Sequence, residues 1–127
     1  MSRKSLPGLG ELESAILETI WQKSPITVRG VLDRLNRHCA YTTVMTVMQR
    51  MSDKGILRRR LKNNTYFYEA ALPKEKFVKQ TVAKTFNQLL EGYGDLALAK
   101  FLDALDEVDP KRLALLRKKF HNPITKP

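Results

Sequence analysis

Apolar positions in the first half of the chain recur every three or four residues in three separate stretches, which is the spacing of amphipathic helices. They predict helices over 10–23, 28–36 and 42–54. Thr27 is the expected N-cap of the second helix, because its hydroxyl can accept a hydrogen bond from a first-turn amide. Gly55 is the expected C-cap of the third helix, where the backbone turns left-handed.

Beyond the third helix the periodicity changes to that of two short strands, over 56–61 and 65–70. The letters KNN between them predict a polar hairpin tip, since Asn tolerates the left-handed backbone that tight hairpins need. Ile26 is a candidate for a further short strand. Three helices followed by a hairpin are the elements of a winged helix-turn-helix, in the order that this fold requires.

Pro73 marks the point after which the pattern is wholly helical. We expect a winged helix-turn-helix DNA-binding domain over 1–73, a helical dimerisation domain over 74–120 and a frayed tail over 121–127. The expected fold class is mainly α, an α+β winged helix with a small β-hairpin wing and a C-terminal three-helix dimerisation unit.

The three C-terminal helical stretches carry many apolar side chains for so short a unit. Gly92 and Gly94 are expected to break the first helix, and Asp109-Pro110 to begin the last. A unit of roughly fifty residues is marginal on its own, so burial against a second copy of the chain is the better explanation. The expected dimerisation residues are Phe86, Leu89, Leu98, Phe101, Leu102, Leu105 and Leu116.

The charge of the chain is unbalanced, with 23 Lys and Arg against 13 Asp and Glu and a net charge of +10. Such an excess favours a polyanionic partner: DNA, RNA or an anionic membrane surface. Between Tyr41 and Lys62 the chain has six basic residues and one acid, which is half of the excess. The charge therefore gathers where the third helix and the hairpin are expected.

The polar face of the third helix offers small hydroxyl side chains, which can approach base edges and thymine methyl groups closely. It carries Thr42, Thr43, Thr46 and Arg50. The basic hairpin suits the DNA backbone or the minor groove, and its candidate residues are Arg58, Arg59, Arg60, Lys62 and Asn63. Each feature alone also fits a solvated helix face or a charged sheet edge. Together, in this order, they favour nucleic-acid binding.

The sequence offers no evident catalytic constellation. Cys39 is the only cysteine, so neither an intramolecular disulfide nor a cysteine-based metal cluster is expected. We expect no enzyme activity, no cofactor and no metal. The N-terminal stretch has acids where a signal peptide needs an apolar core, and no stretch reaches transmembrane length. The expected location is the cytoplasm, without membrane attachment.

Three segments carry a resemblance to a known family: LGELESAILETIW, AYTTVMTVMQRMSDKGIL and YFYEA. The chain resembles the penicillinase repressors, the BlaI/MecI type of transcriptional repressor, over about residues 9–120. The resemblance implies a homodimer that binds a palindromic operator in double-stranded DNA and blocks transcription of resistance or stress genes. Carried over by position, it implies a recognition helix that uses Thr42, Thr43, Met45, Thr46 and Arg50.

Two features depart from that family's pattern. Members inactivated by proteolysis are cut at an Asn-Phe bond, where this chain has Lys100-Phe101, and copper-responsive members carry paired C-terminal cysteines, which this chain lacks. The inducing signal, and any sensor or protease partner, are therefore not identified by the sequence. Two other functions stay open at this point: an RNA-binding or ribosome-associated basic protein, and a winged-helix module that binds an acidic protein.

Overall fold

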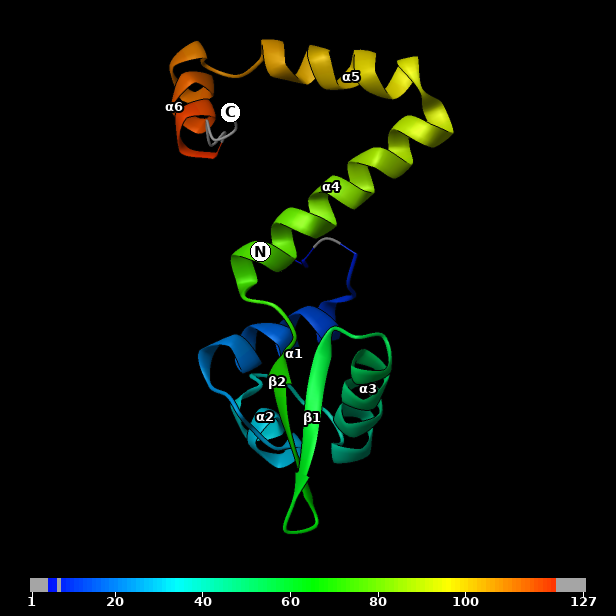
Figure 1. The fold of residues 1–127 in the computed structure, drawn as a ribbon, viewed down its shortest axis with the longest axis vertical. Helices are drawn as coiled ribbons and strands as arrows, with labels where there is room; N and C mark the ends of the chain where they lie inside the picture. The colour runs from blue at the N-terminus through cyan, green and yellow to red at the C-terminus, as the bar shows by residue number, and fades with distance from the viewer. Residues whose placement is uncertain (1–4, 7, 121–127) are drawn as a thin grey trace, which may run out of the picture. The chain divides into compact units, whose positions relative to one another are not determined.

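The computed structural model of the chain describes residues 5–6 and 8–120. The predicted tail over 121–127 lies outside the described residues. Within these residues, six helices and one two-stranded antiparallel sheet follow in chain order (Figure 1), which confirms the predicted fold class. The elements are α1 (Glu11–Gln22), α2 (Val28–Arg34), α3 (Tyr41–Asp53), β1 (Leu57–Lys62), β2 (Thr65–Ala70), α4 (Lys74–Tyr93), α5 (Asp95–Asp106) and α6 (Pro110–Phe120).

The chain forms two compact units, Met1–Thr85 and Phe86–Pro127. Helix α4 belongs to both, because the division falls after its twelfth residue. This division does not test the functional boundary expected at Pro73, because compactness does not say which residues bind DNA or a partner. That boundary remains a prediction.

The first unit has a closed apolar core, to which α1, α2, α3 and both strands contribute. Ile26 also forms an antiparallel bridge with Tyr68, with the two N–H···O hydrogen bonds at 3.0 and 2.8 Å, so the expected short strand is present. The buried apolar side chains are Ile16, Leu17, Ile20, Ile26, Val28, Val31, Val44, Met48, Met51, Leu57 and Tyr68.

Local chemistry sets the helix starts in this unit. The N–H of Gly30 donates to Thr27 Oγ1 at 3.0 Å, so Thr27 is the N-cap of α2 as predicted. The N–H of Gly10 donates to Glu13 Oε1 at 2.9 Å at the start of α1, where this carboxylate also lies close to the positive end of the helix.

The first turns of α4 are anchored to α1 within the same unit. Trp21 Nε1 donates to the carbonyl oxygen of Leu72 at 2.9 Å, and its ring meets that of Phe77 edge to face, 5.7 Å between centroids. Lys74 Nζ lies 3.0 Å from Glu18 Oε1. Phe77 therefore packs with the first unit, although its helix continues into the second.

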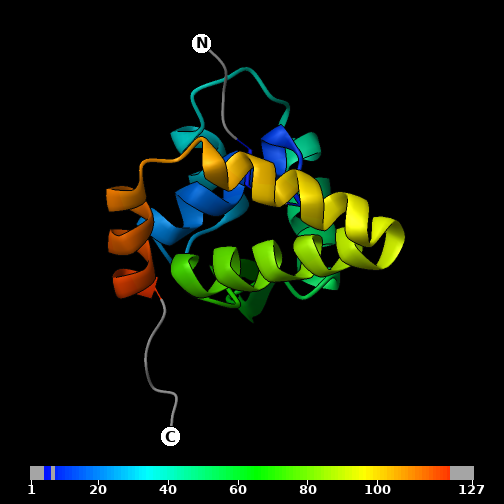
Figure 2. The ribbon, with the colours of Figure 1, turned by 90° about the horizontal axis from the view of Figure 1, so that it is seen from above.

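The second unit consists of the end of α4 with α5 and α6 (Figure 2). The expected break at Gly94 is confirmed, because this residue has a φ of 52° between α4 and α5. The expected break at Gly92 is wrong: α4 continues to Tyr93, since one glycine costs a helix only about 1 kcal/mol. Asp109 caps α6 as predicted, with its Oδ1 accepting from Lys111 N–H at 3.0 Å.

Candidate nucleic-acid interface

Helix α3 has an apolar face that is buried and a polar face that is exposed. Val44, Met48 and Met51 lie in the core of the first unit. This burial fixes the rotation of the helix, so the opposite face must meet solvent. The exposed polar residues of α3 include Thr42, Thr43, Thr46, Gln49 and Arg50.

The end of α3 sets the direction in which the chain enters the wing. Gly55 has a φ of 83°, which a side chain would make costly. Its N–H donates to Ser52 O at 3.0 Å, and the N–H of Ile56 donates to Met51 O at 2.9 Å. This pair of bonds is a Schellman motif, which ends α3 and leads directly to the buried Leu57 of β1.

The wing is the hairpin of β1 and β2, closed by a two-residue turn. Asn63 and Asn64 both have positive φ, 52° and 64°, as a type I′ turn requires. Lys62 pairs with Thr65 across the turn. The tip is therefore one residue shorter than the predicted KNN, because Lys62 belongs to β1, and the side chains around it are exposed.

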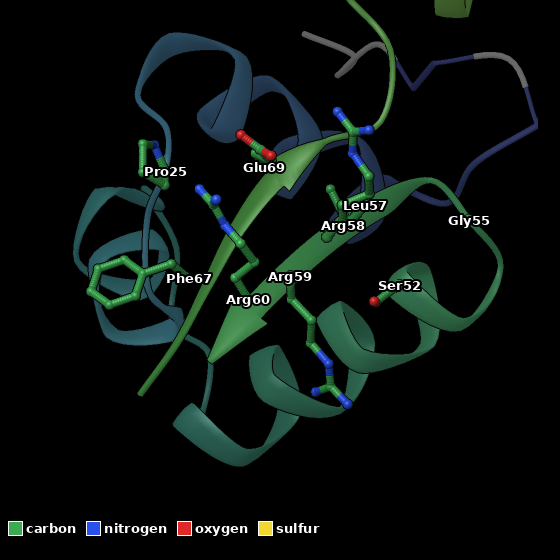
Figure 3. A pocket seen from close by; sticks show the side chains of 9 residues that line it. All are labelled: Pro25, Ser52, Gly55, Leu57, Arg58, Arg59, Arg60, Phe67 and Glu69. Carbon is green, nitrogen blue, oxygen red and sulfur yellow. The ribbon is translucent and has the colours of Figure 1, made fainter. Parts of the chain in front are cut away.

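The three consecutive arginines of β1 lie on two faces of the wing. In the strand register Arg59 is opposite Tyr68, whereas Arg58 is opposite Glu69 and Arg60 opposite Phe67. Figure 3 shows Arg59 pointing towards α3, while Arg58 and Arg60 point away from it, into the region of Glu69 and Phe67. A hollow of about 580 Å³ lies around this strand. The predicted arginine run is thus split by strand alternation.

Arg59 is held in place by two tyrosines. Its Nη1 donates to the Tyr68 hydroxyl at 3.3 Å, and its Cζ lies 4.1 Å from the centroid of the Tyr66 ring. The hydrogen bond to Tyr68 is the main cause that raises the pKa of Arg59 above its ordinary value. The position of the guanidinium over the Tyr66 ring adds a cation–π attraction.

Met45 does not share the open polar face of α3. It is half-buried against the core of the first unit, and with Tyr41 and Gln49 it lines a hollow of about 290 Å³ that also has wing residues in its wall. The family-based expectation that Met45 takes part in DNA recognition stays a prediction. Its half-buried position favours apolar contact over hydrogen bonding.

The second unit has an apolar surface of its own. The rings of Phe86 of α4 and Phe101 of α5 are in contact at a tilt of 57°, with centroids 5.2 Å apart, and both line an apolar hollow of about 390 Å³. Of the expected dimerisation residues, Phe86 and Leu105 are half-buried. The other five, Leu89, Leu98, Phe101, Leu102 and Leu116, are 39–54% exposed.

No group of three or more His, Cys, Asp and Glu side chains in 5–6 and 8–120 is placed to hold a metal ion. Within the part of the chain that the structure describes, no helix combines the length and the apolar character of a membrane span.

The family model of the penicillinase repressors matches residues 9–122. The chain belongs to the penicillinase repressor family. The transcriptional regulator BlaI of Mycobacterium tuberculosis is 33% identical over 116 residues, which cover 87% of this chain and 84% of that protein. The penicillinase repressor of Staphylococcus aureus is 26% identical over 104 residues, covering 80% of this chain and 82% of that protein.

Among solved structures, the transcriptional regulator Tm0710 from Thermotoga maritima aligns with a TM-score of 0.48 at 20% identity. The alignment covers 91% of this chain and 81% of that one.

Family membership confirms the resemblance seen in the sequence and makes this protein a DNA-binding transcriptional repressor. In this repressor the exposed threonines of α3 and the basic wing belong to one compact unit. The assignment of single residues to base or backbone contacts stays a prediction.

Three residues in the wing or in the helices next to it were not predicted as site residues from the sequence: Arg29 of α2, Tyr41 of α3 and Tyr66 of β2. The guanidinium of Arg29 lies 5.1 Å from the centroid of the Tyr41 ring. This pair joins two helices and has no local spacing that a sequence pattern would reveal. For Tyr66 a signal did exist, because strand alternation pairs it with Leu61 on the face that also carries Arg59.

Proposed function

We propose that the repressor binds a palindromic operator as a homodimer, with its second unit as the dimer interface and α3 with the wing as the DNA-reading surface. One observation carries the proposal. None of the described residues of α4, α5 and α6 is buried, although these helices hold large apolar side chains. Leaving such side chains in water is unfavourable, and a second copy of the chain would cover them.

The form of the apolar surface supports this interpretation. Its hollow of about 390 Å³ is lined largely by apolar side chains, among them Phe86, Leu89 and Phe101. Stable homodimer interfaces have this composition at their centre, with aromatic side chains as anchors. Two equal chains would meet by a two-fold axis, which presents the same patch on both sides.

A two-fold dimer would determine the symmetry of the DNA site. Its two α3 helices would enter successive major grooves on one side of the duplex, ~34–36 Å apart. Thr42, Thr43, Thr46 and Arg50 would contact base edges, while the wing would contact the backbone or the minor groove. The operator should then be a palindrome. The proposed activity is binding alone and includes no chemical step.

The test of the DNA site is a selection from random duplex DNA with the full chain at near-physiological salt. The expected product is a two-fold palindrome whose half-sites are about ten base pairs apart, centre to centre. No enriched motif, with binding that disappears as salt rises, would contradict the proposal. It would instead favour RNA or an acidic protein as the partner.

The test of the interface is analytical ultracentrifugation of the double variant Phe101→Asp, Leu105→Asp. We expect monomers with much weaker operator binding, because two carboxylates would be buried in the apolar interface. Asn87→Asp is the matched control, since it adds a carboxylate at an exposed polar position of the same unit. A double variant that remains dimeric would show that the interface lies elsewhere.

A further inference from the structure

A furrow of about 290 Å³ lies between helix α3 and the wing. Tyr41 and Gln49 of α3 line one part of it, Asn64 and Tyr66 of the wing another, and Arg29 of α2 contributes as well. Residues with hydroxyl, amide and guanidinium groups thus line this space beside the apolar Val28 and Met45, and none of the described residues that line it is an Asp or Glu. The furrow suits a ligand that accepts hydrogen bonds and carries negative charge.

Both tyrosines of the furrow carry an arginine against the ring. The Cζ of Arg29 lies 5.1 Å from the centroid of the Tyr41 ring, and the Cζ of Arg59 lies 4.1 Å from that of Tyr66. Arg59 is not itself a lining residue of the furrow, but it lies at its edge, because it contacts Tyr66 and donates to Tyr68 Oη at 3.3 Å, and both tyrosines line the furrow. A guanidinium held this way has lost most of its freedom before any ligand arrives, so binding orders less of the side chain.

The geometry of duplex DNA indicates which negatively charged group would lie in the furrow. The major and minor grooves are separated by one sugar–phosphate strand. A helix in the major groove and a hairpin at the adjacent minor groove must therefore stand on either side of that strand. The space between α3 and the wing then faces its phosphates.

We propose that the furrow between α3 and the wing takes one phosphodiester of the operator strand, held by Arg29 and Arg59 and by the hydroxyl groups of Tyr41 and Tyr66. The inference rests on the proposed reading function of α3 and the wing. It assigns Arg59 to the strand between the grooves, separately from Arg58 and Arg60, which lie on the opposite face of the hairpin.

The test is a double-mutant cycle with the full-length protein on its selected operator. The operator is prepared as a series of duplexes. In each duplex a single phosphate of one strand is replaced by an uncharged methylphosphonate. On the natural operator, Arg59→Ala should weaken binding by about 10–100-fold, as expected for hydrogen bonds to a charged group. The dependence of log K on log salt should become shallower by about one.

The decisive readout is the coupling to one phosphate. At a single methylphosphonate position, Arg59→Ala and Arg29→Ala should both lose most of their effect, because the charge they contact is already gone. Arg58→Ala and Arg60→Ala should keep their full effect on that same duplex. Arg59→Lys keeps the charge but not the planar stack, and it should bind with intermediate affinity.

The outcomes separate the inference from the function on which it rests. If the wild-type protein shows no sequence-selective binding, the proposed function fails. If it binds selectively but Arg29 and Arg59 couple to different phosphates, or to none, the furrow does not hold the strand and the inference is wrong. Unfolding curves from Trp21 fluorescence check that each variant keeps its fold. Tyr66→Phe, which removes only the hydroxyl, measures the contribution of that hydroxyl to binding at the same phosphate.

Discussion

The two units of the repressor differ in what holds them together. Among the described residues of Met1–Thr85, eleven apolar side chains from three helices, both strands and the segment before α2 are buried. In Phe86–Pro127, no described residue is buried, and the packing includes one aromatic pair, Phe86 with Phe101. The first unit contains its own core, whereas the second leaves its large apolar side chains at least partly exposed.

This difference assigns a different source of stability to each unit. Burial of apolar surface is the main favourable term in folding, so the first unit has what it needs within one chain. The helices of the second unit have no buried described residue, and short helices are marginal in water without packing. On the proposed function, its stability comes from a second copy of the chain.

The largest expected effect comes from removing a core side chain of the first unit. Leu17→Ala should lower the free energy of unfolding by about 2–5 kcal/mol, because Leu17 is fully buried and the change leaves a cavity. Trp21 is the only tryptophan, and it lies in this unit, so its fluorescence during urea denaturation measures the effect.

Leu102→Ala is the matched control in the second unit. The same atoms are removed from a side chain that is 54% exposed, so the Trp21 transition should shift by less than about 0.5 kcal/mol. Equal shifts of that transition by both variants would contradict the view that only the first unit is an independent core.

Much of the first unit could be predicted because its signals are local. Thr27 as an N-cap and Gly55 at the end of α3 each follow from the conformation that one backbone position requires. Asn63 and Asn64 likewise match the left-handed turn of the wing. The spacing of Val44, Met48 and Met51 gave the buried face of α3, because a helix has one period and one inner side.

The features that could not be predicted depend on contacts between distant segments, which the hydrophobic periodicity of the sequence does not reveal. Met45 borders the buried face of α3 and is half-buried, because it packs against the core and lines a hollow together with residues of α2 and the wing. Phe77 belongs to a C-terminal apolar stripe in the sequence, yet it packs on Trp21. Gly92 shows a third limit: a glycine is compatible with a helix end but does not compel one.

A pair of glycine substitutions sharpens the comparison with a smaller effect. At Gly30 in α2, an added Cβ would lie 2.7 Å from Cγ1 of Ile26, which is buried and bridged to Tyr68. Gly30→Ala should therefore destabilise the first unit by about 1–3 kcal/mol, despite the better helix propensity of Ala. Urea denaturation followed by Trp21 fluorescence measures this.

Gly92→Ala should have the opposite sign. Beyond the adjoining helix backbone and chain neighbours, no described atom lies within 4 Å of the added Cβ, and the residue is inside α4, so the helix should gain up to about 1 kcal/mol. Circular dichroism at a fixed protein concentration would show the gain. A loss of helix instead would mean that a partner surface closely covers this position.

The last expected effect concerns protein concentration, and it addresses the comparison directly. If the second unit is stabilised by a second copy, each tenfold increase in protein concentration should add about 1.4 kcal/mol to its apparent stability, by mass action. The first unit should show no such dependence, because its core lies within one chain. Denaturation at several concentrations separates the two, since Trp21 fluorescence reports the first unit and far-ultraviolet circular dichroism also reports α5 and α6. A fluorescence midpoint that stays fixed while the dichroism midpoint rises is the expected result. Midpoints that coincide and move together would mean that the two units unfold as one, and that the closed core does not make the first unit independent.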